Sequence, residues 1–576
     1  MSRFATFLVI TMLCGIAAAQ KPIVQLPKTY INTTYAQPSG TTWLVHSSPQ
    51  LNSAINASVP GDMIVLDAGV TYSGNFHIPS KSNPNNKWIY VVSSALNKLP
   101  VAHRVSPSDA ANMPRIVTPN VTAAIIFDGG ANHWRFAGIE VTSTSTYVPS
   151  PTVSPNGYTY FLVGSQSFPT PLPDSITFDR CYIHGSPTQD VAQGIIGSGS
   201  NYAVVDSYIS GIHASGQDTQ AFLAFDTPGP IKLFDNYLEA AGENVMFGGS
   251  GKNNNRGVPS DIEARNNYLY KPLSWAKSGL GGTLAPNNQW VAKNAFELKS
   301  AQRVLIDGNV IENVWAAGQS GFAILLTVRT SQSGDFAVVN DVTITNNVLK
   351  NVVSGFNTSA KDDECGPGGG YPDCKNAGSQ DRWNIADNLI LFYDPTRPGG
   401  ARNIGLQVGG GMDRINNTPG TLRDVVFQHN TMVSAASTPC AYSVFFSANG
   451  QAPPFPVPLT SNLWVVDNAF CRQPTGDWGL RGTSGLTQYM GAPASLDSRY
   501  AGNVMYFPTG DKIQVFPVHN YASTVPFIYV NPIGGNYQLA SPYWTDTTDG
   551  ALAGVSASKL SPPSLTASAA LSIMRR

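Results

Sequence analysis

The chain has 576 residues, of which 42% are hydrophobic and only 12% are charged, and its formal net charge is −1. So much apolar content with so little charge excludes a disordered chain. The lack of any basic surplus excludes recognition of nucleic acid through its phosphates. We therefore expect a globular protein with a large buried core, and one that is monomeric.

The first residues have the pattern of a secretory signal peptide, which we assign to 1–19. Arg3 is followed by an apolar run from Phe7 to Ile16 and by the small residues Ala17, Ala18 and Ala19. The run is too short for a membrane-spanning helix, which needs about 20 apolar residues. We expect a secreted protein, extracellular or periplasmic, that does not stay in the membrane.

After an N-terminal extension at 20–41, the spacing of Leu51, Ala54 and Ile55 predicts a short amphipathic helix over 48–57. A strand is predicted next, within the segment from Pro60 to Gly69. A helix at this place, ahead of a series of strands, is suited to capping the end of a stack of strands, where unpaired backbone groups would otherwise be exposed.

The middle of the chain repeats one unit, which is a short apolar strand followed by Asn or Asp and then by another apolar residue. The units begin at Ile176, Ala203, Ile231, Ile262, Val304, Val342, Trp383, Val425 and Trp464. A repeat at this spacing indicates a solenoid. Asn tolerates the left-handed backbone of a sharp corner, and stacked Asn side chains can form a hydrogen-bonded ladder. We therefore predict an all-β, single-stranded right-handed parallel β-helix over 42–543, and a loosely ordered tail at 544–576 that is rich in Ser, Ala and Pro.

Five cysteines remain after the signal peptide. Cys365 with Cys374, and Cys440 with Cys471, are plausible disulfides in an oxidising compartment. Cys181 lies within an apolar strand and is expected to be a buried free thiol.

The segment Leu51-Asn-Ser-Ala-Ile, the segment from Gly61 to Tyr72 and the Asn-centred coils together resemble the pectate-lyase-type right-handed β-helix superfamily. The resemblance covers roughly Thr42 to Tyr543 and concerns the fold. It leaves function open, because this fold hosts lyases, glycosidases, esterases and adhesins.

Ionisable residues on two neighbouring strands are the main candidates for chemistry. In an extended segment Glu297 and Lys299 share one face, and Arg329 would follow one coil later. This arrangement is similar to the Lys-Ser strand and following-coil Arg of polysaccharide lyases of the chondroitinase B and alginate lyase type. The resemblance implies that Lys299 is the base and that Arg329 assists the departing oxygen. It also implies that Ca²⁺ is held by Asn294, Glu297 and Glu243. This chain departs from the family because the acidic residue lies closer to the Lys, and the interval to the Arg is longer.

Polar turns precede a second set of strands and predict a stripe along one side of the solenoid, suited to a polysaccharide. The expected substrate-binding residues in or near it are His213, Asp218, Asn244, Lys271, Trp315 and Gln407. Glu297 and Lys299 could equally form a surface ion pair, and Asn244 and Asn294 could be ladder or turn residues.

Three functions remain open. The first is a lyase that cleaves a uronate-containing polysaccharide by β-elimination. The second is a glycoside hydrolase using two of the carboxylates Asp218, Asp226, Glu243 and Glu297. The third is a β-helix protein that binds carbohydrate or forms part of a surface without catalysis.

Overall fold

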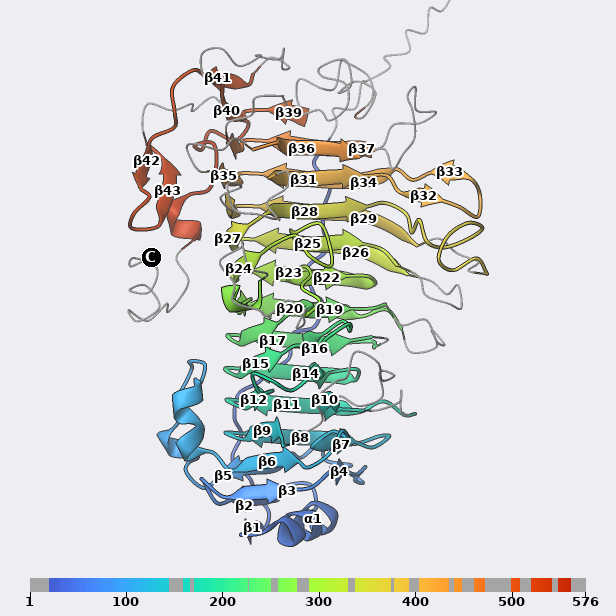
Figure 1. Cartoon of the computed structure of the whole chain (residues 1–576), viewed down its shortest axis with the longest axis vertical. Coiled ribbons are helices and arrows are strands. Elements are labelled where there is room, and N and C mark those ends of the chain that lie inside the picture. Colours follow the sequence, from blue (N-terminus) through green and yellow to red (C-terminus); the bar gives the residue numbers. More distant parts are fainter. Residues whose placement is uncertain are drawn as a thin grey trace, which may run out of the picture.

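A computed structural model describes residues 20–144, 159–165, 170–225, 227–249, 257–276, 290–329, 337–373, 378–392, 403–434, 440–447, 460–471, 490, 499–507, 519–540 and 547–560. Within them the chain coils into a right-handed parallel β-helix, and its coils stack along one long axis (Figure 1). No helix among these residues is both long and apolar enough to cross a membrane.

Each complete coil contributes one strand to each of three parallel sheets. Sheet A has 14 strands: β1 (Thr42–Val45), β2 (Met63–Leu66), β5 (Ile89–Ser93), β8 (Asn132–Ala137), β11 (Asp174–Asp179), β14 (Ser200–Val205), β17 (Ile231–Phe234), β20 (Ser260–Arg265), β23 (Ala301–Asp307), β26 (Val338–Thr345), β29 (Ser379–Ala386), β34 (Leu422–Gln428), β37 (Thr460–Val466) and β39 (Tyr500–Ala501).

Sheet B also has 14 strands: β3 (Thr71–Ser73), β6 (Arg115–Thr118), β9 (Glu140–Ser143), β12 (Tyr182–His184), β15 (Tyr208–Ile212), β18 (Tyr237–Ala240), β21 (Tyr268–Tyr270), β24 (Val310–Val314), β27 (Val348–Val352), β30 (Leu389–Phe392), β35 (Thr431–Val433), β38 (Ala469–Phe470), β40 (Val504–Tyr506) and β41 (Tyr521–Ser523).

Sheet C has 11 strands: β4 (Phe76–Ile78), β7 (Ile125–Phe127), β10 (Thr159–Gly164), β13 (Val191–Ile196), β16 (Gln220–Ala224), β19 (Glu243–Phe247), β22 (Phe296–Leu298), β25 (Phe322–Thr327), β28 (Ser354–Ser359), β31 (Ile404–Gly409) and β36 (Tyr442–Ser447). Two antiparallel hairpins lie outside the sheets, β32 (Met412–Asp413) with β33 (Thr418–Pro419), and β42 (Tyr529–Asn531) with β43 (Asn536–Leu539).

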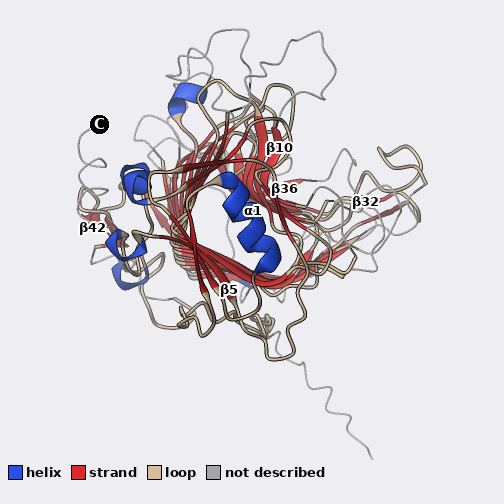
Figure 2. Cartoon of the chain, turned by 90° about the horizontal axis from the view of Figure 1, so that it is seen from below, coloured by secondary structure: helices blue, strands red, loops and turns tan. Residues whose placement is uncertain are grey.

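The predicted capping helix is confirmed. Helix α1 (Ser48–Ala57) lies across the open end of the coil and buries Leu51, Ala54 and Ile55 against the first strands (Figure 2). The helix covers apolar residues that the first coil would otherwise expose to water. Short 3-10 turns are η1 (Leu96–Lys98), η2 (Pro107–Asn112), η3 (Leu273–Trp275) and η6 (Ala557–Lys559).

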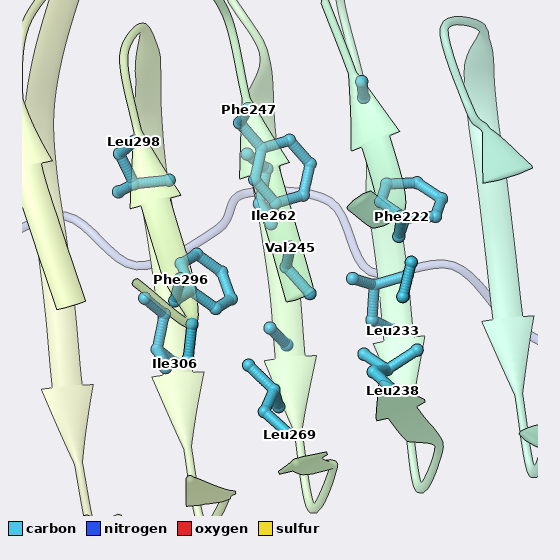
Figure 3. Packing of buried hydrophobic residues seen from close by; sticks show 14 of the residues in the cluster. Phe222, Leu233, Leu238, Val245, Phe247, Ile262, Leu269, Phe296, Leu298 and Ile306 are labelled. Carbon is cyan, nitrogen blue, oxygen red and sulfur yellow. The ribbon is translucent and has the colours of Figure 1, made fainter. Parts of the chain in front are cut away.

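One continuous core fills the space between the three sheets. Inward side chains alternate along each strand and stack with the same position one coil away, as with Val245 and Phe296, or Phe247 and Leu298 (Figure 3). The predicted repeat units correspond to successive strands of sheet A, so the sequence period is the coil itself. Only two strands per coil were readable from the sequence, whereas the structure has three.

The predicted asparagine ladder is also confirmed. It runs along the corner between sheets A and B, where each amide donates to the carbonyl oxygen of the next at 2.9–3.1 Å: Asn236, Asn267, Asn309, Asn347, Asn388, Asn430, Asn468, Asn503 and Asn520. Each ladder residue is also bonded to the backbone of an adjoining coil, for example Asn309 to the carbonyl of Ala264 at 2.9 Å. The corner therefore buries polar groups that are fully paired.

The predicted disulfide between Cys440 and Cys471 is present, and Cys181 is a buried free thiol, as expected. Cys374 of the other predicted pair lies outside the described residues, as do the predicted signal peptide at 1–19 and, of the predicted tail at 544–576, residues 544–546 and 561–576.

The extension at 20–41 runs lengthwise along the outside of sheet A. Its backbone is bonded to Asp341 through Gln25, to Asp261 through Lys28 and to Arg135 through Thr33. Residues 547–560 fold back over the other end of the solenoid, where the amide of Val555 donates to the hydroxyl of Thr431 at 2.8 Å.

Candidate active site

A cleft with a volume of about 400 Å³ opens on the outer face of sheet C, over β22 and β25. Lys299, Arg329 and Glu297 all line it, together with Lys293, Tyr371 and others: Gly249, Gln319, Ser320, Leu325, Thr327, Asn357 and Glu364. Glu297 on β22 pairs with Leu325 on β25. Side chains two residues apart in an extended segment share a face, so Lys299, directly after the first strand, and Thr327, at the end of the second, point outward into the same space.

Glu297 and Lys299 share one face of their strand, with 3.9 Å between the carboxylate and the ammonium group. The main chain of Arg329 bonds directly to that of Lys299, the amide of the arginine donating to the lysine carbonyl at 2.9 Å. Two cationic side chains from adjacent coils therefore border one cleft.

Arg329 is held in place by three consecutive acidic residues of the next coil. Its Nη1 lies 3.2 Å from Asp362, 2.6 Å from Asp363 and 3.3 Å from Glu364. These carboxylates raise the pKa of the arginine against the opposing effect of burial, so it stays charged. The acidic run fixes the guanidinium and reduces its local positive charge.

Two buried carboxyl groups lie next to each other here: Glu297, which lines the cleft, and Glu243, which lies behind it and interacts directly with Glu297. Burial, together with the neighbouring Glu243 carboxylate, raises the pKa of Glu297 despite the nearby Lys299. The charges of Lys293 and Lys299 overcome burial at Glu243 and lower its pKa. The pair therefore shares its charge unequally.

Several buried polar atoms here have no hydrogen-bond partner among the described residues. They are Oε1 of Glu243, Oε2 of Glu297, and both Oδ1 and Nδ2 of Asn294. Burying a polar atom without a hydrogen-bond partner costs free energy. A group of such atoms beside a cleft therefore indicates a site shaped for a ligand that pairs with them. An arrangement of carboxylate and amide oxygens is what Ca²⁺ prefers, and these donors fit such an ion.

Lys293 is a second cation beside these carboxylates, in addition to Lys299. Its ammonium lies 2.5 Å from Asp218 and 3.5 Å from Oε1 of Glu243. Asp218, expected to bind substrate, therefore pairs with Lys293 at the edge of the cleft. Lys293 was not selected from the sequence, although it lies an even number of residues before Glu297 and could have been found by the same alternation.

Four of the six expected substrate-binding residues are buried and do not line the cleft: His213, Trp315, Asn244 and Lys271. His213 stacks on Trp290 with ring centroids 3.6 Å apart, and burial lowers its pKa to about 4, so it is neutral near pH 7. Trp315 packs in a small apolar cluster with Ala276, Ala292 and Val353. Asn244 is fully buried and accepts a hydrogen bond from Lys271 at 2.9 Å.

Lys271 is itself fully buried, and its ammonium donates to the main-chain carbonyls of Ala240, Ala241 and Gly242. Burial lowers its pKa to about 7. It thus binds the turn that immediately precedes Glu243. Gln407 lies two coils beyond Arg329 and donates to Asn357, a cleft residue, at 2.9 Å.

Sequence reasoning also missed Gln220, Tyr371 and the acidic run at 362–364. Gln220 donates to Oε2 of Glu243 at 2.7 Å, and it accepts from Gln193 in the preceding coil at 3.0 Å. The contacts of Gln220, and those of Arg329 with the acidic run, join residues that are 23 to 34 positions apart in the sequence. Only the coil register reveals them.

No known family model matches the sequence, and no curated protein matches it significantly. Among solved structures, the PL6 family alginate lyase AlyGC is similar, with 12% identity and a TM-score of 0.48; 91% of this chain is covered. The chain spans 58% of the length of that lyase. A mannuronic acid specific family 6 polysaccharide lyase from human gut microbiota has 12% identity and a TM-score of 0.47, with coverage of 84% of this chain and 92% of that chain. The family 6 lyase Pedsa3628 from Pseudopedobacter saltans has 9% identity and a TM-score of 0.33, with 83% and 92% covered. Similarity at this level concerns the β-helix fold alone.

Proposed function

We propose that this chain is a polysaccharide lyase that cleaves a uronate-containing polymer by β-elimination. The observation that carries the proposal is the shared cleft, in which Lys299 and Arg329 from adjacent coils face the same space. The pattern of residues 1–19 supports export of the enzyme to the compartment where such polymers occur.

In this reaction Lys299 takes the proton from the carbon next to the uronate carboxylate. The carbon–oxygen bond to the departing sugar then breaks as a carbon–carbon double bond forms in the uronate ring. Arg329 stabilises the departing oxygen with a hydrogen bond, and that oxygen takes up a proton from water to become a hydroxyl. Positioning matters as much as basicity here, because a general base must reach its proton at hydrogen-bonding distance. The acidic run at 362–364 holds Arg329 in that position.

We propose that Ca²⁺ takes part through Glu243, Asn294 and Glu297, whose unpartnered buried oxygens fit a hard cation. When bound, the ion would supply positive charge to neutralise the uronate carboxylate. Lys293 contributes in the same sense, since its ammonium lines the cleft and already balances Glu243.

Hydrolysis by paired carboxylates has less support. Glycosidases need two accessible carboxyl groups about 5 Å apart or about 6.5–9.5 Å apart. Glu243 and Glu297 are buried and lie within hydrogen-bonding range of each other, so no sugar fits between them. Asp218 is bonded to Lys293, and Asp226 lies outside the described residues.

The test is to incubate the purified protein, with calcium, with a panel of uronate-containing polymers, and to follow the ultraviolet absorbance of unsaturated uronate ends. We expect activity in the wild type and a loss of roughly 100-fold or more in Lys299→Met, the range for removal of a general base. Lys350→Met is the matched control, because Lys350 also pairs with a glutamate, at 3.0 Å, but lies on sheet B.

New reducing ends without the absorbance would overturn the lyase in favour of a hydrolase. The absence of any product from every polymer, with binding retained, would favour a carbohydrate-binding protein instead.

A further inference from the structure

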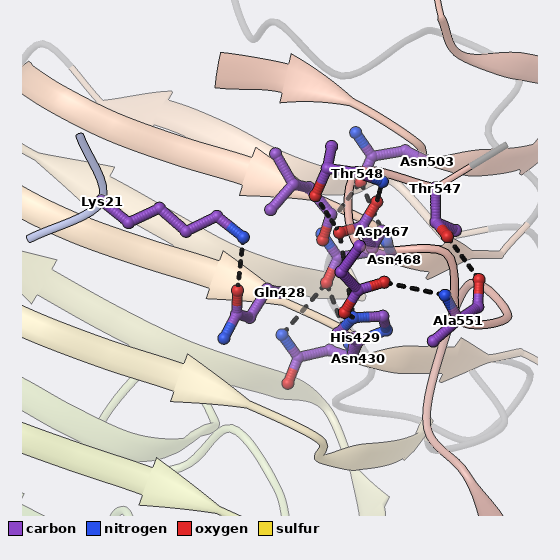
Figure 4. Close-up of polar contacts among 12 residues, drawn as sticks. Lys21, Gln428, His429, Asn430, Asp467, Asn468, Asn503, Thr547, Thr548 and Ala551 are labelled. Atoms are coloured by element: carbon purple, nitrogen blue, oxygen red, sulfur yellow. Dashed lines mark hydrogen bonds and ion pairs between the residues drawn. The ribbon is translucent and has the colours of Figure 1, made fainter. Parts of the chain in front are cut away.

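A second cluster of ionisable residues lies at the far end of the solenoid, away from sheet C. His429 and Asp467 occupy the same corner position in successive coils, each directly before a ladder residue, Asn430 or Asn468. The segment 547–560 folds over this corner, so that Thr547 and Thr548 lie beside Asp467 (Figure 4). The same segment brings Asp549 to the histidine. Three separate stretches of the chain therefore supply one imidazole and two carboxylates.

The three ligand atoms face one another. Nε2 of His429 lies 2.9 Å from Oδ2 of Asp549 and 3.8 Å from Oδ2 of Asp467, and all three atoms lie within 4.8 Å of one another. A single N–H can serve only one of these oxygens, and 3.8 Å exceeds a hydrogen bond. Ligands about 2.0–2.1 Å from a tetrahedral zinc ion are about 3.3 Å apart, a value that lies between the two observed separations.

We propose that His429, Asp467 and Asp549 bind a first-row transition-metal dication of the zinc class, which fastens the segment 547–560 to the solenoid. An imidazole with two carboxylates suits such ions, whereas calcium prefers oxygen ligands alone. This site would be distinct from the cleft, and it does not depend on the proposed lyase activity.

The surroundings are those of a supported metal site. Asp467 is fully buried, and its carboxylate accepts hydrogen bonds from the amide and hydroxyl of Thr548 at 2.8 and 2.5 Å, which fix its orientation. Asp549 is 48% exposed, so the ion has a path from solvent. A third carboxylate, Asp387, lies one coil earlier and is paired with Lys559 of the same segment at 3.8 Å.

The chain contains comparison pairs that lack the second carboxylate. His77 with Asp128, and His46 with Asp67, form exposed contacts at 2.8 and 2.6 Å. His184 meets Glu140, but that carboxylate is already bonded to Arg115 at 2.8 Å. Only the His429 cluster joins two carboxylates to an imidazole among the described residues.

The experiment uses the full chain, stripped of metal, and titrates it with Zn²⁺ alone in a calorimeter. We expect one ion per chain in the wild type, no saturable site in His429→Gln, and affinity weaker by at least about 10-fold in Asp549→Asn. His77→Gln and His46→Gln, each in an exposed pair of one histidine with one aspartate, should both match the wild type.

Hydrogen exchange of residues 547–560 gives a second readout. Zn²⁺ should slow their exchange in the wild type and leave it unchanged in His429→Gln. Zinc binding that survives in both cluster variants, or no saturable binding in the folded wild type, would overturn the proposal.

Discussion

Two lines of buried polar side chains run along the solenoid, and they end differently. The asparagine ladder at the corner of sheets A and B continues without interruption from Asn236 to Asn520, each amide pairing with the next. The other line, on sheet C, passes from Gln193 to Gln220 and stops at Glu243, whose Oε1 has no hydrogen-bond partner among the described residues. A continuous line indicates a structural role, whereas the other line stops beside the cleft, where Glu243 meets the cleft residue Lys293.

The largest loss of stability is expected when the asparagine ladder is broken. Asn309→Ala removes the acceptor for both the main-chain and side-chain amides of Asn267, and the donor to Ala264. Each buried group left unpaired costs about 1–3 kcal/mol, so we expect the free energy of unfolding to fall by about 3–5 kcal/mol in urea denaturation.

Asn52→Ala, on the exposed side of helix α1, is the control and should change stability by about 0.5 kcal/mol or less. Equal losses in the two variants would contradict a special role for the ladder.

A smaller effect, with a signature in pH, is expected from Lys271. Its pKa is lowered to about 7 by burial, so the unfolded chain binds this proton more tightly than the folded chain between about pH 7 and the ordinary lysine value of about 10.4. Stability contributed by this site therefore rises with pH across that window. Lys271→Met removes the dependence while leaving three carbonyls without their donor.

We expect the Met variant to be less stable by about 2–3 kcal/mol near pH 9, and the difference from wild type to shrink toward pH 7. Chemical denaturation at several pH values measures this. A difference that stays constant with pH would show that the amine is not perturbed.

The ladder and the cleft also differ in how far the sequence predicts them. The repeat, helix α1 and the asparagine corner follow from local patterns, because each coil repeats the same few residues. Lys299, Glu297 and Arg329 could be grouped because alternation and the coil period act over one turn. The contacts of Lys293 with Asp218, 75 residues earlier, and of Arg329 with Asp362 depend on loop paths between coils that no period encodes.

The same dependence on loop paths explains why residues expected in the polar stripe are buried in the structure. His213 and Lys271 lie in polar turns that precede strands and Asn244 lies at the start of a strand, which is the pattern expected of a surface groove. In the structure they are covered by the turn at Ala240–Gly242 and by Trp275 and Trp290. Polarity alone does not distinguish a residue that faces ligand from one that satisfies buried backbone.

A third prediction concerns Glu297, which lies where the line of polar side chains on sheet C is interrupted. Burial raises the pKa of Glu297, so the folded chain holds its proton more tightly than the unfolded chain above about pH 4.3, the ordinary glutamate value. Its contribution to stability is complete at low pH and is lost as pH rises through the folded pKa. We expect Glu297→Gln to remove about 1–2 kcal/mol of this pH-dependent loss in calcium-free urea titrations between pH 5 and pH 8.

Calcium should offset the loss in the wild type and have less effect in the variant, because the ion competes with the proton for the same oxygens. A wild type whose calcium response is independent of pH would contradict this assignment.

The smallest expected effect tests whether the cleft depends on the placement of Lys299. A Cβ at Gly249 would lie 2.7 Å from Cδ of that lysine, so Gly249→Ala has to push the side chain aside. Misplacement of a reacting group by a fraction of an ångström lowers turnover by about 10-fold. The variant also places alanine at a φ of +89°, which costs about 1–2 kcal/mol in stability. Gly69→Ala is the matched control, because its φ is +77° and nothing lies within 4 Å of the added carbon. Both variants should lose similar stability, and only Gly249→Ala should lose turnover on the polymer that the wild type cleaves. If turnover falls equally in both, backbone strain explains the loss, and Lys299 does not need its present position.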